Sequence, residues 1–185
     1  MEEIARNELL HVRFYRGVLG ARAVSRPEID IAGLCRRQGG RPRDNFDPFA
    51  SEMNFFLGGM LMEDVGVTAY HGAVNALQTA STAGILGVEA YHMGMVRSTL
   101  YRMGTEARNA ANAISDARDK LDGPADLDQG IVRECHSNFV PRDADAKVFT
   151  RTPQQVLNIV YLTPNAGVSG GGIFPKGMNG ALHTT

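Results

Sequence analysis

The feature that most constrains this chain is a Glu-x-x-His step that occurs twice, at Glu8/His11 and at Glu89/His92. Each copy lies in a segment whose apolar residues recur at steps of three and four, the spacing of a helix face. Residues three apart share a face, so each step puts a carboxylate beside an imidazole. Glu63 lies on the apolar stripe of a third such segment. Because an unpaired charge turned toward a core is costly, these side chains are expected to hold cations.

The pattern predicts a helical bundle around a pair of metal ions. Carboxylates and imidazoles suit iron and manganese, and carboxylates that bridge two cations are typical of di-metal bundles. Such bundles draw carboxylates from four helices, whereas only three segments of this chain supply them. The predicted cofactor is therefore di-iron or di-manganese. The predicted metal ligands are Glu8, His11, Glu63, Glu89 and His92.

Three other side chains lie close to these positions in the pattern. Tyr15 and Tyr70 share the faces of the predicted ligands, and we prefer core packing for both over a role at the site. His71 follows Glu63 by two helical turns, and a surface position or an ordinary hydrogen bond in the core is the preferred interpretation.

Length and composition narrow the class of protein. A chain of 185 residues suits one domain with a real core. A net charge of -1 gives no reason to expect nucleic acid or an anionic membrane as a partner. The longest apolar stretch, residues 55–62, is too short to span a bilayer. Cys35 and Cys135 are isolated, so they predict no ligand set, and whether they pair stays open.

The start of the chain carries no signal peptide and no transit peptide. Two explanations follow: the protein is kept in the cytosol, or the sequence is truncated at its N-terminal end. The compartment is therefore left open.

Helical spacing and turn residues predict the layout of the chain. A helical bundle would occupy residues 1–121, with a crossover loop at 21–45 and an extension at 122–185. Asp47-Pro48 predicts a helix start, and Gly66 a kink or break in that helix. The extension is mostly irregular, with one short helix near 153–162 that opens with a capping box, and a glycine-rich tail that wraps the bundle.

The chain also resembles the plant and algal desiccation-related proteins, a branch of the ferritin-like superfamily. The resemblance extends from end to end, and its blocks are specific when taken together. These blocks are residues 8–13, 46–49, 63–73, 88–92, 151–153, 159–161 and 172–180.

The resemblance implies an all-α, ferritin-like helical bundle of which this chain contains three of the four helices. Members of the family begin with a further helix that carries another carboxylate, and no counterpart is present here. Three helices of such a bundle leave an apolar groove of roughly several hundred square ångströms, which monomeric proteins seldom expose. We expect a protein partner, a second copy of the chain or the C-terminal tail to cover it.

Three functions remain open at this stage. The first is a stress-related di-metal protein that handles O2 or peroxide. The second, from a different class, is a non-catalytic structural or assembly subunit that uses the bundle and its groove for protein contacts. Metal storage without turnover ranks last, because nothing in the sequence indicates a cage-forming surface. Whether the protein is an enzyme therefore stays undecided.

Overall fold

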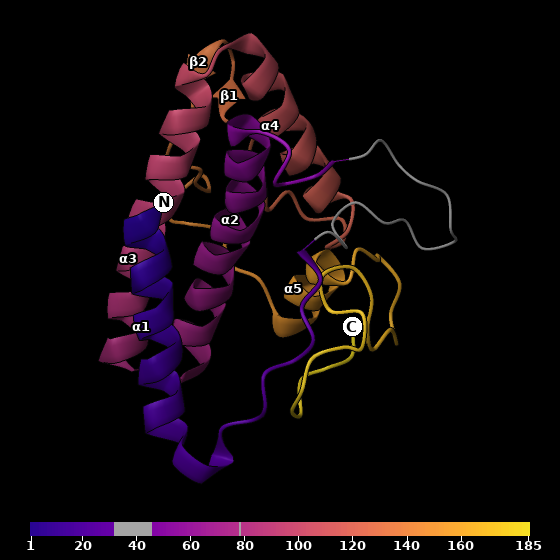
Figure 1. The fold of residues 1–185 in the computed structure, drawn as a ribbon. Helices are drawn as coiled ribbons and strands as arrows, with labels where there is room; N and C mark the ends of the chain where they lie inside the picture. The colour runs from indigo at the N-terminus through magenta and orange to yellow at the C-terminus, as the bar shows by residue number, and fades with distance from the viewer. Residues whose placement is uncertain (32–45, 78) are drawn as a thin grey trace.

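The computed structural model describes residues 1–31, 46–77 and 79–185. Helices dominate this part of the chain, so the all-α prediction is confirmed (Figure 1). The only described strands form a two-residue antiparallel hairpin. The elements are α1 (Glu2–Leu19), the 3-10 helix η1 (Gly20–Arg22), α2 (Glu52–Leu77), α3 (Ala80–Arg102), α4 (Thr105–Asp119), β1 (Val132–Arg133), β2 (His136–Ser137) and α5 (Pro153–Val160).

Local chemistry explains where several helices begin and end. Helix α1 ends at Gly20, whose φ of 54° suits glycine far better than other residues. Helix α3 begins after Thr79, whose side chain accepts a hydrogen bond from the backbone N–H of Thr82. Helix α5 has the predicted capping box, formed by Thr152 and Gln155, with proline in the first helical position.

The start of α2 differs from the prediction. Asp47 caps a turn, since its carboxylate accepts from the N–H of Phe49, and the helix begins five residues later. Ser51 does the capping, because its hydroxyl accepts from the N–H of Asn54. Phe49, in the turn before the helix, is 67% exposed. No break occurs at Gly66, because α2 continues through it to Leu77.

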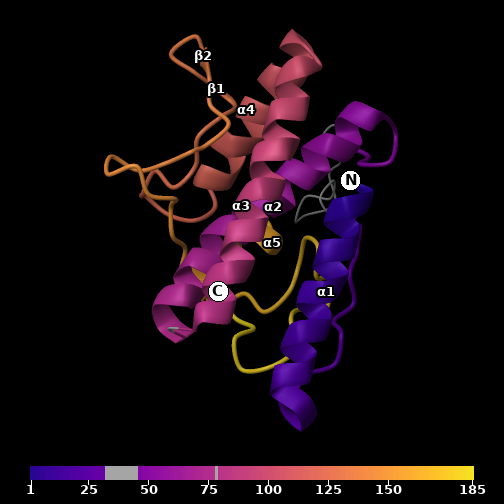
Figure 2. The ribbon, with the colours of Figure 1, turned by 90° about the vertical axis from the view of Figure 1, so that its left-hand side faces the viewer.

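The helices surround two hydrophobic clusters. Helices α2 and α3 pack closely along their length and α4 packs against both, while α1 stands apart from this pair (Figure 2). The larger cluster joins one end of α1 to α2, α3 and α4, and it includes one residue of the extension, Ile131. Its buried members are Ile4, Leu57, Met60, Val96, Leu100, Ala107, Ala111 and Ile131.

The C-terminal tail packs on α5 and on the segment that follows α1. Tyr161 and Ile173 belong to the second cluster, between α5 and the tail. The carbonyl of Ile173 accepts from the N–H of Asp30, and Asn179 donates to Ser25. The tail therefore fastens residues 23–31, while the apolar side chains along α1 stay exposed. The domain division at 121/122 stays a prediction.

Two sequence-based expectations concern the cysteines and membrane spans. Cys135 is an exposed free cysteine, and Cys35 lies outside the described residues, as does most of the predicted crossover loop. Within the described ranges, none of the helices combines the length and the apolar character that a bilayer crossing requires.

Candidate metal centre

The five predicted ligands converge between three helices. Glu8 and His11 come from α1, Glu63 from α2, and Glu89 and His92 from α3. Ligand atoms of four of them, all except His11, lie within 4.8 Å of one another. His11 borders this group, with its Nδ1 atom 3.0 Å from Glu89 Oε1. The side chains of Glu63, Glu89 and His92 are almost fully buried, whereas that of Glu8 is 42% exposed.

The two Glu-x-x-His steps are paired crosswise. His11 of α1 faces Glu89 of α3, and His92 of α3 faces Glu8 of α1, with Nδ1 3.3 Å from Oε1. Glu8 Oε1 also lies 3.4 Å from His11 Nδ1, so this one oxygen stands between the two imidazoles. Glu63 Oε2 completes the group, 3.5 Å from His92 Nδ1. The arrangement has one imidazole on each side and carboxylates between them.

The donor atoms of this cluster have no hydrogen-bond partners. Among the described residues, eight buried side-chain nitrogen or oxygen atoms lack one, and five of the eight belong to the cluster. Buried polar atoms are normally satisfied, and oxygen and imidazole nitrogen donors facing a common centre suit a divalent cation. The cluster therefore fits a metal site. The five atoms are Glu8 Oε1, His11 Nδ1, Glu63 Oε2, Glu89 Oε1 and His92 Nδ1.

Burial and like charge raise the proton affinity of the carboxylates. Desolvation, followed by the charge of Glu8, raises the pKa of Glu63 to about 7. Desolvation, followed by the charges of Glu8 and Glu63, raises the pKa of Glu89 to about 8. Desolvation lowers the pKa of His92, which favours the neutral imidazole that binds metals. Bound cations would relieve the repulsion that otherwise keeps protons on these carboxylates.

Two tyrosines extend the cluster along α1 and α2. The rings of Tyr15 and Tyr70 stack with centroids 6.2 Å apart, and Tyr70 meets His11 edge-on. Burial raises the pKa of Tyr70, so its phenol stays protonated. His71 lies elsewhere, with Nδ1 3.1 Å from the carbonyl oxygen of Phe149, in keeping with the ordinary hydrogen bond preferred for it.

Sequence reasoning missed two residues that shape the centre. The Asn7 amide lies 3.1 Å from His92 Nε2, on the side of the ring away from the cluster. Gly66 leaves room for a ligand, since a Cβ atom there would stand 3.3 Å from Glu89 Oε2. Nothing in the sequence indicated a role for Asn7 at the site, apart from its position next to Glu8. Gly66 did give a signal, because it follows Glu63 by one turn on the same face.

A buried charge network behind the cluster was also missed. Asp64, next to Glu63 on α2, accepts from Arg97 of α3 and Arg118 of α4, both at 2.7 Å. Both arginines are essentially fully buried. Arginines within the apolar faces of α3 and α4 were the available signal, because a buried charge needs a partner. Asp64 therefore ties three helices together at the turn that carries Glu63.

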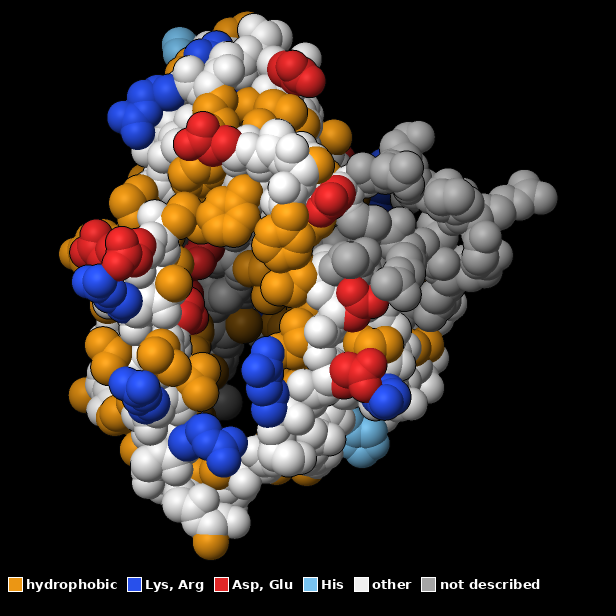
Figure 3. All heavy atoms as spheres, in the orientation of Figure 1, with side chains coloured by type: hydrophobic (Ala, Val, Ile, Leu, Met, Phe, Trp, Pro, Cys, Tyr) orange, Lys and Arg blue, Asp and Glu red, His pale blue; other side chains and the backbone are white. Residues whose placement is uncertain are grey.

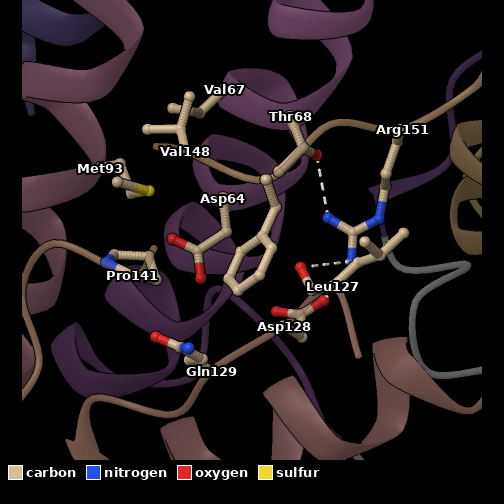
Figure 4. A pocket seen from close by; sticks show the side chains of 11 residues that line it. Asp64, Val67, Thr68, Met93, Leu127, Asp128, Gln129, Pro141, Val148 and Arg151 are labelled. Carbon is tan, nitrogen blue, oxygen red and sulfur yellow. Dashed lines mark hydrogen bonds and ion pairs between the residues drawn. The ribbon is translucent and has the colours of Figure 1, made fainter. Parts of the chain in front are cut away.

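The same network fastens the extension to the bundle. Arg151 donates to Asp122 at 2.6 Å, to Asp128 at 2.5 Å and to Thr68 of α2 at 2.8 Å. Figure 4 shows the contacts with Thr68 and Asp128 at the edge of a small cavity, which Asp64 also lines. The cavity has room for about one water molecule. It is separate from the cluster of predicted ligands.

One face of the molecule is hollowed beside α1. In the space-filling view, hydrophobic side chains border the upper part of this hollow, Lys and Arg side chains stand at its lower rim, and acidic side chains reach its wall (Figure 3). Large apolar side chains on α1 and α2 stay exposed. Those on α1 are Leu9, Leu10, Val12, Phe14, Val18 and Leu19, and those on α2 are Phe55, Met62 and Leu77.

The fold and the site define the class of protein: a helical bundle whose helices bring carboxylates and histidines together at a site that fits a metal. A family model described as "Ferritin-like domain" matches residues 1–102, more than half of the sequence. The chain belongs to this ferritin-like domain family. The predicted fold class, a ferritin-like helical bundle, is thereby confirmed.

Two curated proteins are similar to this chain. The chain is 29% identical over 158 residues to the protein named ferritin-like catalase Nec2 of Nesocodon mauritianus, covering 74% of this chain and 50% of that relative. It is 30% identical over 132 residues to desiccation-related protein PCC13-62 of Craterostigma plantagineum, covering 60% of this chain and 42% of the relative. The desiccation-related resemblance predicted from sequence motifs is thus confirmed. The chain spans about half the length or less of these relatives. No solved structure matches it significantly.

Proposed function

We propose that this protein binds a pair of iron or manganese ions between α1, α2 and α3 and uses them to handle O2 or peroxide. The observation that carries the proposal is the convergence of five buried ligand atoms from three helices, none of which makes a hydrogen bond. A hydrogen-bonded structural cluster would have satisfied these atoms internally.

Each side chain has a distinct role in this proposal. Glu8, which lies between both imidazoles, would hold the metal together with His11 and His92. Glu63 and Glu89 would add negative charge from the buried side and give up their protons as metal binds. A bound metal pair supplies two-electron redox chemistry. The half-exposed side of Glu8 marks the direction from which a small substrate would arrive.

Peroxide is favoured over O2 as the substrate by one relative, which is named a catalase. The test is to purify the full chain, load it with Fe(II) or Mn(II), remove excess metal and measure metal content together with O2 release from hydrogen peroxide. About two ions per chain, with O2 release that is lost in Glu89→Gln, would support the proposal. Metal content near zero would refute it.

A non-catalytic assembly role is the second candidate, and the exposed apolar side chains of α1 favour it. In this role a protein partner or a second copy would cover the hollow. Sedimentation equilibrium of the full chain tests it against Leu10→Glu, with exposed Arg13→Glu on the same helix as the control. An oligomer that dissociates in Leu10→Glu alone, in a protein that holds no metal, would favour assembly over redox chemistry. Metal storage remains the least favoured alternative.

A further inference from the structure

His92 is in contact with polar groups at both ring nitrogens. Its Nδ1 atom faces the cluster, 3.3 Å from Glu8 and 3.5 Å from Glu63. Its Nε2 atom lies 3.1 Å from the side-chain amide of Asn7, which reaches across from α1 to α3. The His92 side chain is only 3% exposed, so water does not readily replace this contact.

The contact at Nε2 affects whether Nδ1 can bind a metal. A neutral imidazole carries one proton, and a metal takes only the nitrogen that lacks it. For Nδ1 to bind a metal, the proton must be on Nε2, where it needs an acceptor. The oxygen and nitrogen ends of an amide have the same shape, so a half-turn of the Asn7 amide offers either an acceptor or a donor at the same place.

We propose that Asn7 is a positioning residue that sets the tautomer of His92, with its amide oxygen accepting the Nε2 proton when Nδ1 binds metal. In the metal-free protein the amide turns over and donates to Nε2, and the Nδ1 proton faces the carboxylates of Glu8 and Glu63. An amide suits this task because it serves both tautomers and adds no charge to a site with three carboxylates. The inference rests on the proposed function.

A purely structural role for Asn7 is the alternative. Because α1 stands apart from α2 and α3, the amide could serve only to hold α1 in place. That role would change stability, but it would not select a tautomer or depend on an acceptor.

The test combines NMR with zinc affinity, using Zn(II) as a diamagnetic probe. Long-range 1H–15N spectra of 15N-histidine-labelled full chain report which nitrogen of His92 carries the proton, with His92→Gln assigning the signals. We expect the proton on Nδ1 without zinc and on Nε2 with it. Asn7→Leu should weaken zinc binding by about tenfold or more, while Asn7→Asp, which keeps an acceptor, should bind at least tenfold more tightly than Asn7→Leu. Asn109→Leu, the same change at an exposed site on α4, is the matched control.

Each outcome decides the inference. It is wrong if zinc binds through Nε2, if Asn7→Leu binds zinc like the wild type, or if Asn7→Asp is as weak as Asn7→Leu. In these cases the wild type still binds zinc, so the proposed function survives. A wild type that binds no zinc, iron or manganese overturns both. Should Asn7→Leu fail to fold, the wild-type spectra and Asn7→Asp still decide.

Discussion

Gly66 lies directly opposite the carboxylate of Glu89, close enough that a Cβ atom at this position would stand 3.3 Å from Oε2. That separation is tighter than ordinary van der Waals contact, so a larger residue would displace the carboxylate from the cluster. The glycine therefore contributes to the geometry of the centre, although it carries no functional group.

Replacing Gly66 should lower metal affinity, whereas replacing a helical glycine away from the cluster should change only the stability of the protein. Gly66→Ala should weaken metal affinity by about tenfold, because the methyl group pushes the Glu89 carboxylate away from its partners. Gly84→Ala on α3 is the control, since a Cβ there meets nothing within 4 Å. The control should gain about 0.5 kcal/mol of stability from reduced chain entropy and keep its metal affinity. Equal metal affinity in the two variants, measured by competition with a chelator, would contradict the assigned role.

The stability of the metal-free protein should fall as pH rises. Burial raises the pKa of Glu63 to about 7 and that of Glu89 to about 8, from 4.5. Between pH 4.5 and these raised pKa values, the folded state binds more protons than the unfolded state. The stability that is present below pH 4.5 is therefore lost as the pH rises through 7 and 8. For Glu63 alone the loss is about 3 kcal/mol.

Urea unfolding in the presence of a chelator, at pH 4.5 and pH 8.5, measures this loss. Glu63→Gln should show a smaller decrease than the wild type, because its amide does not ionise. A wild-type protein that is equally stable at both pH values, or a variant with the same decrease, would show that burial does not hold protons on these carboxylates.

Asp64→Asn should destabilise the whole bundle. The change leaves the buried guanidinium groups of Arg97 and Arg118 with less negative charge, at a cost of about 3–5 kcal/mol. The exposed pair of Arg6 and Glu2 is the control, and Arg6→Ala should cost about 1 kcal/mol or less. Denaturant unfolding checks both. A cost for Asp64→Asn as small as that of the control would mean that the network does not support the fold.

Gly72→Ala should loosen the extension from α2. A Cβ atom at Gly72 would overlap the carbonyl oxygen of Arg151, the residue that joins the extension to the bundle. We expect faster proteolytic cleavage and faster hydrogen exchange in residues 122–151. Gly87→Ala, where a Cβ meets nothing, should leave both rates unchanged. Unchanged protection of this segment in Gly72→Ala would count against a tight junction at Gly72.

Local pattern was enough to predict the helices and the side chains of the cluster. Apolar spacing predicted that Glu8/His11 and Glu89/His92 lie in helices, as they do in α1 and α3, and the capping box predicted α5, because these signals act between residues close in the chain. The same spacing placed all five predicted ligands on inward faces. The capping signal failed at the start of α2, where Asp47 caps a turn and Ser51 caps the helix.

Tertiary structure alone decided which groups meet. The crosswise pairing of His11 with Glu89 and of His92 with Glu8 depends on how α1 lies against α3, and no spacing within one helix specifies it. The contact of Asn7 with His92 and the link from Arg151 to Thr68 likewise join residues about eighty positions apart. Sequence determined which chemical groups point inward, because helical periodicity is local. The folded structure determined their partners, because burial and charge pairing act between segments that only folding brings together.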